Sequence, residues 1–166
     1  MESQKLKFCV YTSTRAEYGL LYWVMKAMEE DNNIVLHIIV SGTHLSSSFG
    51  STVKEIEKDK WSNIKKIKTL AERDEKKSLI KSVSIGNENL SNYLEKLKPN
   101  CMLILGDRFE LFSVMTSCTI LGIPIAHISG GEITEGAIDN QIRHAITKLA
   151  HLHFVANSIF KKRVLQ

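Results

Sequence analysis

The chain has 166 residues, 43% of them hydrophobic and 24% charged, and its formal net charge is +4. This length suits one domain with a real core or part of a larger protein, and the composition is that of a globular domain. The basic residues are dispersed without stacking aromatics, and no apolar run is long enough for a membrane span or a signal peptide, so we expect no nucleic-acid partner, no membrane and a cytoplasmic location.

Strands and helices alternate along the predicted chain. Apolar runs predict strands at 8–11, 34–40, within 61–70, and at 101–105, 123–128 and 152–155. Helical spacing predicts helices at 18–30, 52–58, 76–97, 109–121 and 138–149, and a Ser/Gly-rich loop covers 41–50. Strands separated by helices pair in parallel, so the predicted fold class is α/β, a three-layer sandwich with a mainly parallel sheet.

Neither the cysteines nor the lysine-rich runs of the sequence predict special chemistry. Cys9, Cys101 and Cys118 are odd in number and form no CxxC pair, so we interpret them as reduced core thiols and expect no metal site. The lysine-rich runs at 65–68 and 161–163 are interpreted as solvated faces, although a mildly positive pocket for an anionic small molecule stays open. A helix capped by Ser158 reaches the end of the chain without Gly or Pro, from which we expect a fragment of a longer protein.

Polar residues follow four predicted strands. They are Arg15, His44, Asp107 with Arg108, and Glu132. The carboxyl ends of parallel strands form the edge where open α/β sheets bind ligands. Each residue also has a plainer interpretation: Arg15 in solvent, His44 in an ordinary loop, and Asp107 as a helix N-cap. Their occurrence at successive strand ends favours a site.

The segment after the strand at 123–128 holds a further polar cluster. Glu132, Glu135 and Asp139 lie where this strand ends and the next helix begins. Asp139 and Arg143 are four residues apart, as are Asn140 and His144, so each pair shares a helix face. Two interpretations stay open: a surface salt bridge between Asp139 and Arg143, or a carboxylate held by Arg143 at the mouth of a site.

Four motifs together resemble those of a known family. They are TRAEYGLL at 14–21, SGTHLS at 41–46, GDRFE at 106–110 and HISGGEITEGAIDNQIRHAITKLAHLH from His127. In order and spacing they are similar to those of the hydrolysing UDP-N-acetylglucosamine 2-epimerases of the sialic-acid pathway. The resemblance covers essentially the whole chain. It implies that residues 1–166 are an N-terminal Rossmann-like domain of a GT-B type fold, whose second domain is absent from this chain.

The resemblance also implies a reaction. Water and UDP-N-acetylglucosamine would give UDP and N-acetylmannosamine by elimination of UDP and hydration of a 2-acetamidoglucal, without a metal or redox cofactor. The implied catalytic carboxylates are Asp107 and Asp139, and the implied ligand contacts are Arg15, His44, Arg108, Arg143 and His144. Some relatives carry a catalytic glutamate where this chain has Ser129. Serine cannot perform that proton transfer, so either Glu132 replaces it or the sugar differs.

Two alternatives follow from the same residues. One is hydrolysing 2-epimerisation of UDP-N,N'-diacetylbacillosamine on the legionaminic-acid route. The other is a non-catalytic GT-B domain that only binds a sugar nucleotide. The helix at 109–121 is apolar nearly all round, and members of the family commonly form dimers or tetramers, so we expect a homo-oligomer of the full-length protein.

Overall fold

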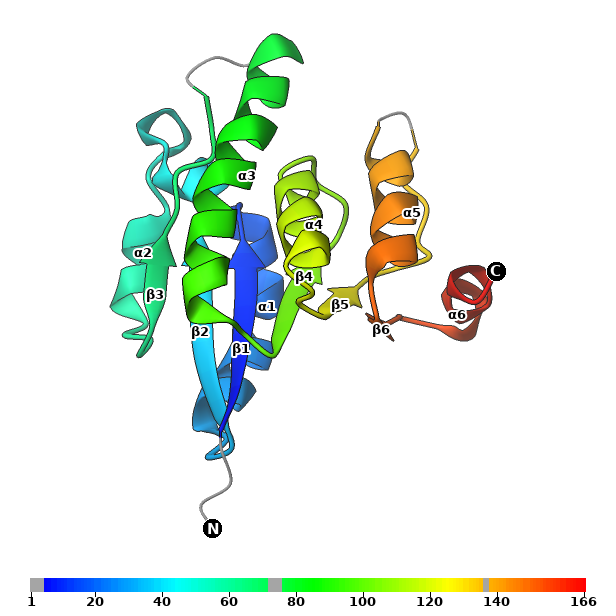
Figure 1. Cartoon of the computed structure of the whole chain (residues 1–166), viewed down its shortest axis with the longest axis horizontal. Coiled ribbons are helices and arrows are strands. Elements are labelled where there is room, and N and C mark those ends of the chain that lie inside the picture. Colours follow the sequence, from blue (N-terminus) through cyan, green and yellow to red (C-terminus); the bar gives the residue numbers. More distant parts are fainter. Residues whose placement is uncertain (1–4, 72–75, 136–137) are drawn as a thin grey trace.

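The computed structural model describes residues 5–71, 76–135 and 138–166, arranged around one six-stranded sheet. The strands are β1 (Leu6–Thr12), β2 (Ile34–Val40), β3 (Ile64–Lys66), β4 (Cys101–Leu105), β5 (Ile125–Ile128) and β6 (Leu152–Phe154). The α-helices are α1 (Arg15–Glu30), α2 (Val53–Lys58), α3 (Lys76–Leu97), α4 (Leu111–Ile120), α5 (Asp139–Leu149) and α6 (Ser158–Val164). Figure 1 shows this alternation along the chain.

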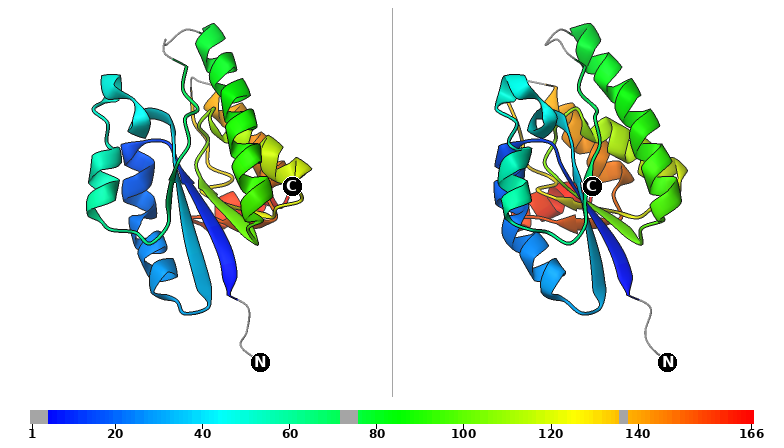
Figure 2. Two further views of the ribbon diagram at one scale, coloured as in Figure 1. Left: turned by 60° about the vertical axis from the view of Figure 1, so that its left-hand side comes forward. Right: turned by 90° about the vertical axis from the view of Figure 1, so that its left-hand side faces the viewer.

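The sheet is parallel throughout, in the order β3-β2-β1-β4-β5-β6. The register of β1 runs from Leu6 opposite Ile34 to Thr12 opposite Val40, and on the other side Phe8 lies opposite Cys101. Helices cover both faces, with α1 and α2 on one side and α3, α4 and α5 on the other (Figure 2). The prediction of a three-layer α/β fold with a parallel sheet is therefore confirmed.

Each face of the sheet has its own apolar core. Leu21 and Met25 of α1 are fully buried on one face, and Leu94, Val114 and Ile146 of α3, α4 and α5 are fully buried on the other. Burial of a side chain of this size contributes about 1.5–3 kcal/mol. The three cysteines are free and buried in these layers, as predicted.

A glycine allows close packing between α3 and α4. Gly86 weakens the helical pattern of α3, because glycine is a poor helix former. A Cβ atom at Gly86 would lie 2.4 Å from the Ser113 side-chain oxygen of α4. Gly86 thus lets the two helices approach closely, and Ser113 donates to the Val83 carbonyl oxygen at 2.9 Å.

Local capping accounts for the boundaries that the sequence analysis misplaced. Helix α1 begins at Arg15 rather than at residue 18, because Thr14 caps it and Glu17 completes a capping box. Asn157, not Ser158, caps α6 by accepting from the Ile159 and Phe160 amides. The loop predicted at 41–50 contains two short 3₁₀ helices, Gly42–Leu45 and Ser47–Phe49.

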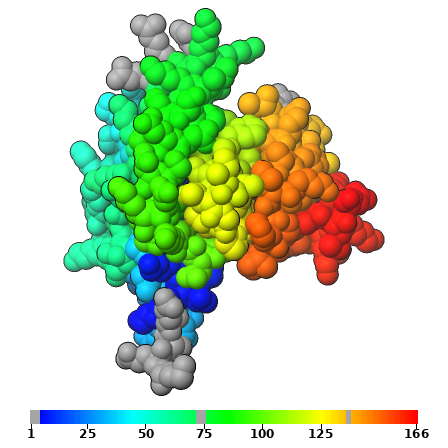
Figure 3. Space-filling view, in the orientation of Figure 1, coloured from blue at the N-terminus to red at the C-terminus, as the bar shows by residue number. Residues whose placement is uncertain are grey.

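Helix α4 is apolar nearly all round because it has neighbours on several sides. Figure 3 shows it between α3 and α5. Most of its apolar side chains are buried, whereas Phe112 and Ile120 are exposed. Its position between two helices accounts for part of the apolar excess, and the homo-oligomer stays a prediction.

Candidate active site

The predicted site segments lie at one edge of the sheet. Arg15 follows β1, His44 follows β2, Asp107 and Arg108 follow β4, and Glu132 follows β5. Since all strands are parallel, these segments share the carboxyl edge. The neighbours β1 and β4 lead into helices on opposite faces of the sheet, α1 and α4 (Figures 1 and 2). Open α/β sheets bind ligands where the connections diverge in this way.

A cleft of about 980 Å³ opens at this edge. Its walls come from the loops after β2, β3 and β4 and from the first turns of α3. Its lining includes Thr43, Phe49, Lys68, Thr69 and Arg108. A volume of this size accommodates a small organic ligand, and two cations face it.

Asp107 is held by an arginine from α5. Its Oδ2 atom accepts a hydrogen bond from Arg143 Nη2 at 2.5 Å and another from Thr134 Oγ1 at 2.8 Å. Arg143 is only 6% exposed. Asp107 was also a candidate N-cap, but α4 begins at Leu111 and Asp107 does not cap it. The carboxylate is instead fixed in position at the edge of the sheet.

The same arginine reaches the turn after β5. Arg143 Nη1 donates to the Ser129 carbonyl oxygen at 2.5 Å and lies 3.6 Å from Glu132 Oε2. Ser129 has a φ of 68°, an uncommon conformation for a residue other than glycine. Ser129 therefore contributes its backbone carbonyl to this contact, and Asp107 and Glu132 share one guanidinium.

The predicted pairing of Asp139 with Arg143 is wrong. Arg143 is buried and turned toward Asp107 and Glu132, and among the described ion pairs none joins it to Asp139. Asp139 is half-buried at the start of α5, and His144 is exposed on the same helix. The interpretation of a carboxylate held by Arg143 thus applies to Asp107. Residues 136 and 137, which precede α5 in the chain, lie outside the described residues.

Arg108 is held by a buried carboxylate, Glu110, that the sequence analysis did not single out. Glu110, 2% exposed, accepts from Arg108 Nε at 3.1 Å and from Nη2 at 2.9 Å. Burial alone would lower the pKa of Arg108, but Glu110, Glu17 and Asp139 raise it above its ordinary value. Arg108 therefore stays charged and keeps a partly exposed face toward the cleft. The local spacing Arg-x-Glu in GDRFE was the available signal.

At the start of α1, the Glu17 carboxylate occupies the amide groups of Ser13 and Thr14. Glu17 Oε2 accepts from the Ser13 amide at 2.8 Å, from Ser13 Oγ at 2.9 Å and from the Thr14 amide at 3.1 Å. Burial raises the pKa of Glu17, and the bonds from Ser13 oppose that shift. Arg15 extends from this turn into solvent and pairs with Glu55 at 3.1 Å.

His44 is buried beneath the same edge. Its Nε2 lies 3.0 Å from Thr12 Oγ1 and its Nδ1 lies 2.7 Å from Thr52 Oγ1. Burial lowers the pKa of His44 to about 4, so the ring is neutral at pH 7. This geometry lets His44 hold the loop after β2 against β1, and direct contact with a ligand stays a prediction.

A second buried histidine, His127, was missed. Its Nε2 lies 2.8 Å from the carbonyl oxygen of Gly106, the residue before Asp107, and therefore carries the donated proton. Gly106 has a φ of 79°, which glycine adopts at little cost. Burial lowers the pKa of His127 to about 4. The histidine ties the turn that carries Asp107 to β5.

Two further properties concern the described residues as a whole. No group of three or more His, Cys, Asp or Glu side chains among them is arranged to hold a metal ion. Their helices are too short or too polar for any one of them to cross a lipid bilayer.

Comparisons with known proteins agree with this fold. The sequence model of the UDP-N-acetylglucosamine 2-epimerase family matches residues 26–166. A GDP/UDP-N,N'-diacetylbacillosamine 2-epimerase (hydrolyzing) of Campylobacter jejuni is 48% identical over 162 residues, 98% of this chain and 42% of that protein. A UDP-N,N'-diacetylbacillosamine 2-epimerase (hydrolyzing) of Legionella pneumophila is 36% identical over 96% of this chain and 42% of its own length.

A solved structure shares the fold at lower sequence identity. The crystal structure of UDP-GlcNAc 2-epimerase from Neisseria meningitidis bound to UDP-GlcNAc superposes with a TM-score of 0.82 at 20% identity, over 96% of this chain and 43% of that one. The chain thus spans about two fifths of the length of these relatives.

Proposed function

The chain belongs to the UDP-N-acetylglucosamine 2-epimerase family, and on this premise we propose that it forms one wall of the active site of a hydrolysing 2-epimerase acting on a UDP-linked 2-acetamido sugar. A second Rossmann-like domain, as in the GT-B type, would supply the opposite wall. The protein would need no metal or redox cofactor.

The observation that carries the proposal is the Asp107–Arg143–Glu132 arrangement. Two carboxylates contact one buried guanidinium at the carboxyl edge of the sheet, beside a cleft lined by Arg108. A 2-epimerisation needs a group that removes the proton at C2 and a group that returns a proton on the other face of the sugar. Two fixed carboxylates at the same arginine suit this exchange.

The proposed reaction has two balanced steps. A carboxylate removes the C2 proton while the bond between C1 and the diphosphate oxygen breaks, so UDP leaves with the electron pair and a C1–C2 double bond forms. Water then adds its hydroxyl to C1, and C2 receives a proton on the opposite face. We assign these proton transfers to Asp107, Glu132 and Asp139, with Glu132 serving in place of the glutamate that Ser129 replaces.

Cations at the edge would stabilise the leaving diphosphate. Arg108 is held by Glu110 and faces the cleft, so its guanidinium is oriented before a ligand arrives. Arg15 is exposed and would have to leave Glu55 to reach a ligand. His44, Arg143 and His144 complete the proposed ligand-binding set, Arg143 through the carboxylates that it positions.

A second substrate has specific support. The Campylobacter jejuni and Legionella pneumophila relatives are named for diacetylbacillosamine substrates, whereas the Neisseria meningitidis structure is named for UDP-GlcNAc. We therefore propose UDP-N-acetylglucosamine and UDP-N,N'-diacetylbacillosamine as the two candidates. The product would be a precursor of sialic acid if the substrate is UDP-N-acetylglucosamine. It would be a precursor of legionaminic acid if the substrate is UDP-N,N'-diacetylbacillosamine.

A product assay with both sugar nucleotides in heavy water tests the proposal. The full-length protein should release UDP from one of them and yield the 2-epimer with deuterium at C2, because the proton removed there exchanges with solvent. Product without deuterium would contradict the elimination route. Absence of UDP release from either sugar would contradict the enzyme assignment and favour a binding domain.

Substitution of the carboxylates gives the first residue-level prediction. Asp107→Asn and Asp139→Asn should each lower kcat about 10²- to 10⁴-fold, because each keeps the side-chain shape and loses the proton-accepting group. Thermal unfolding should show that both variants remain folded. Asp31→Asn, an exposed residue at the opposite end of α1, is the matched control and should leave kcat unchanged. Turnover of Asp107→Asn like that of the unmodified protein would overturn its role.

A further inference from the structure

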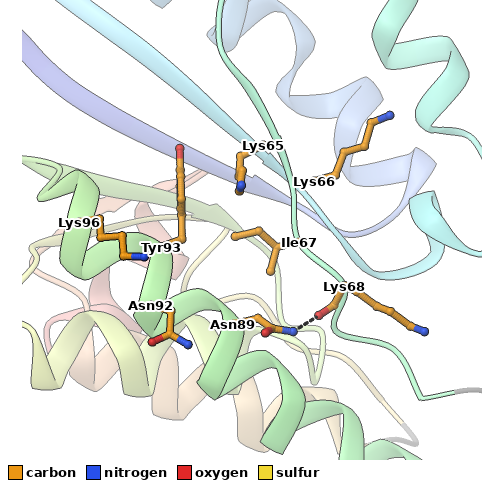
Figure 4. A pocket seen from close by; sticks show the side chains of 8 residues that line it. All are labelled: Lys65, Lys66, Ile67, Lys68, Asn89, Asn92, Tyr93 and Lys96. Carbon is orange, nitrogen blue, oxygen red and sulfur yellow. Dashed lines mark hydrogen bonds between the residues drawn. The ribbon is translucent and has the colours of Figure 1, made fainter.

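A basic groove lies between the edge strand β3 and the second half of α3, outside the candidate active site. It measures about 390 Å³ and is lined by Lys65, Lys66, Ile67 and Lys68 on one side and by Asn89, Asn92, Tyr93 and Lys96 on the other. Figure 4 shows these side chains. Among the described residues that line the groove, none carries a carboxylate.

The wall of the groove formed by α3 is polar, whereas a helix face that only packed against the strand would be apolar. Asn89, Asn92, Tyr93 and Lys96 occur at the spacing i, i+3, i+4, i+7, so they share one face of α3. Asn89 is fixed, since its Nδ2 donates to the Lys68 carbonyl oxygen at 2.9 Å. The apolar face of the helix lies elsewhere, at Leu90 and Leu94 in the core. With Asn89 already bonded, this polar face leaves Asn92, Tyr93 and Lys96 along the groove as candidate ligand contacts.

Strand alternation separates the lysines of β3. Lys65 is on the α3 side, where its Nζ lies 5.6 Å from the centre of the Tyr93 ring. Lys66 points away from Tyr93 (Figure 4), and it forms an ion pair with Glu57. Within the described parts of the chain, no ion pair includes Lys65 or Lys96. Two unneutralised ammonium groups thus lie on opposite walls of one groove.

The hydrogen-bond donors that line the groove indicate which class of ligand would bind there. Ammonium groups only donate hydrogen bonds, and the amides and the phenol add further donors, so the matching group has several acceptor oxygens and negative charge. Lysine binds phosphate as a point charge. Lys68 lines both this groove and the cleft that contains Arg108, so the two sites adjoin.

We propose that this groove is a binding site for a phosphate or diphosphate group, recognised by Lys65 and Lys96 from opposite walls with Asn92 and Tyr93 as further donors. The run at 65–68 is then more than the solvated face that its sequence indicated. A different explanation is that lysines on an edge strand prevent pairing with another chain. That explanation predicts no saturable binding.

Titration of the protein with inorganic pyrophosphate, followed by amide NMR, tests the proposal. We expect saturable shifts of the Asn89 and Asn92 side-chain amides, with an affinity that falls between ~50 mM and ~300 mM salt. Lys65→Gln and Lys96→Gln should each weaken binding at least about tenfold. Lys54→Gln is the matched control, because it removes the same charge from an exposed position of α2, outside the groove and on the other side of the sheet (Figure 2), and it should bind as the unmodified protein does.

Three results would overturn the proposal. Equal weakening in Lys54→Gln and Lys65→Gln would mean unspecific attraction to net charge. Shifts confined to residues around Arg108 would place the anion in the cleft alone. Self-association of Lys65→Gln without any change in pyrophosphate affinity would assign the lysines to edge protection. A parallel titration with UDP distinguishes a nucleoside diphosphate from the inorganic group, since only the former would add shifts beyond those of pyrophosphate.

Discussion

Arg143 shows which features of the site could be predicted from the sequence and which could not. The i, i+4 rule correctly put Asp139 and Arg143 on one helix, and the resemblance put Arg143 in the site. Which carboxylate it contacts depends on how α5 packs on the sheet, because Asp107 is 36 residues away in the chain. A contact of this kind follows from tertiary packing, and no local spacing rule gives it.

The two buried histidines give a prediction for stability. Burial lowers the pKa of His44 and of His127 from 6.5 to about 4. Below pH 6.5 the unfolded chain takes up protons that the folded rings do not, so stability is full above that pH and is lost as the pH falls toward 4. Each ring should account for a loss on the order of 1–3 kcal/mol, measured as the free energy of unfolding in urea between about pH 7.5 and pH 4.5.

His127→Gln separates this effect from that of the carboxylates. Glutamine can still donate to the Gly106 carbonyl oxygen but does not titrate, so the variant should lose less stability on acidification than the unmodified protein. His144→Gln removes an exposed histidine and should keep the original pH dependence. An identical pH dependence in the His127 variant would mean that this ring does not contribute.

At the scale of elements, the sequence predicted most of the fold. The bounds of β2, α3 and β4 agree with prediction, because each is a long apolar or periodic run between clear breakers. The start of α1 was missed although the Thr14-x-x-Glu17 spacing of a capping box was visible. The 3₁₀ helices after β2 could not be predicted, since buried contacts of His44 with Thr12 and Thr52 shape that loop.

The turn after β5 gives a prediction about proton transfer. Ser129 contacts Arg143 through its backbone carbonyl, which Ser129→Ala retains, so kcat should change less than about tenfold. Glu132→Gln should lower kcat about 10²- to 10⁴-fold if Glu132 transfers the proton. Steady-state kinetics of the full-length variants measure both effects. Glu135→Gln, an exposed neighbour, serves as control. A large loss in Ser129→Ala with normal turnover in Glu132→Gln would reverse the assignment.

At the scale of the whole molecule, the proposed active site would have only one of its walls in this chain. It spans about two fifths of the length of its relatives, and the cleft beside Arg108 is bounded by loops of a single sheet edge. Catalysis of elimination requires groups held in register on both sides of the sugar. No pattern within these residues could specify the opposite wall.

This incompleteness leads to a prediction about activity. The 166-residue chain alone should fold and show no detectable release of UDP from either sugar nucleotide, whereas the full-length protein should release it. Circular dichroism would verify folding, and a coupled UDP assay would measure release. Turnover by the isolated chain would mean that the described edge suffices for the chemistry.

The pairing of β1 with β4 has a consequence for the folding pathway. The Lys7 amide donates to Asn100 Oδ1 at 2.8 Å across a separation of 93 residues, far more than between β1 and its other neighbour, β2. Closing a longer loop costs more entropy, about 0.6 kcal/mol for each doubling, and distant pairings slow folding. We expect the segments β1–β3 and β4–β6 to gain structure before they join. Glu17 and Arg108, which interact across that junction, would then meet only in the last step.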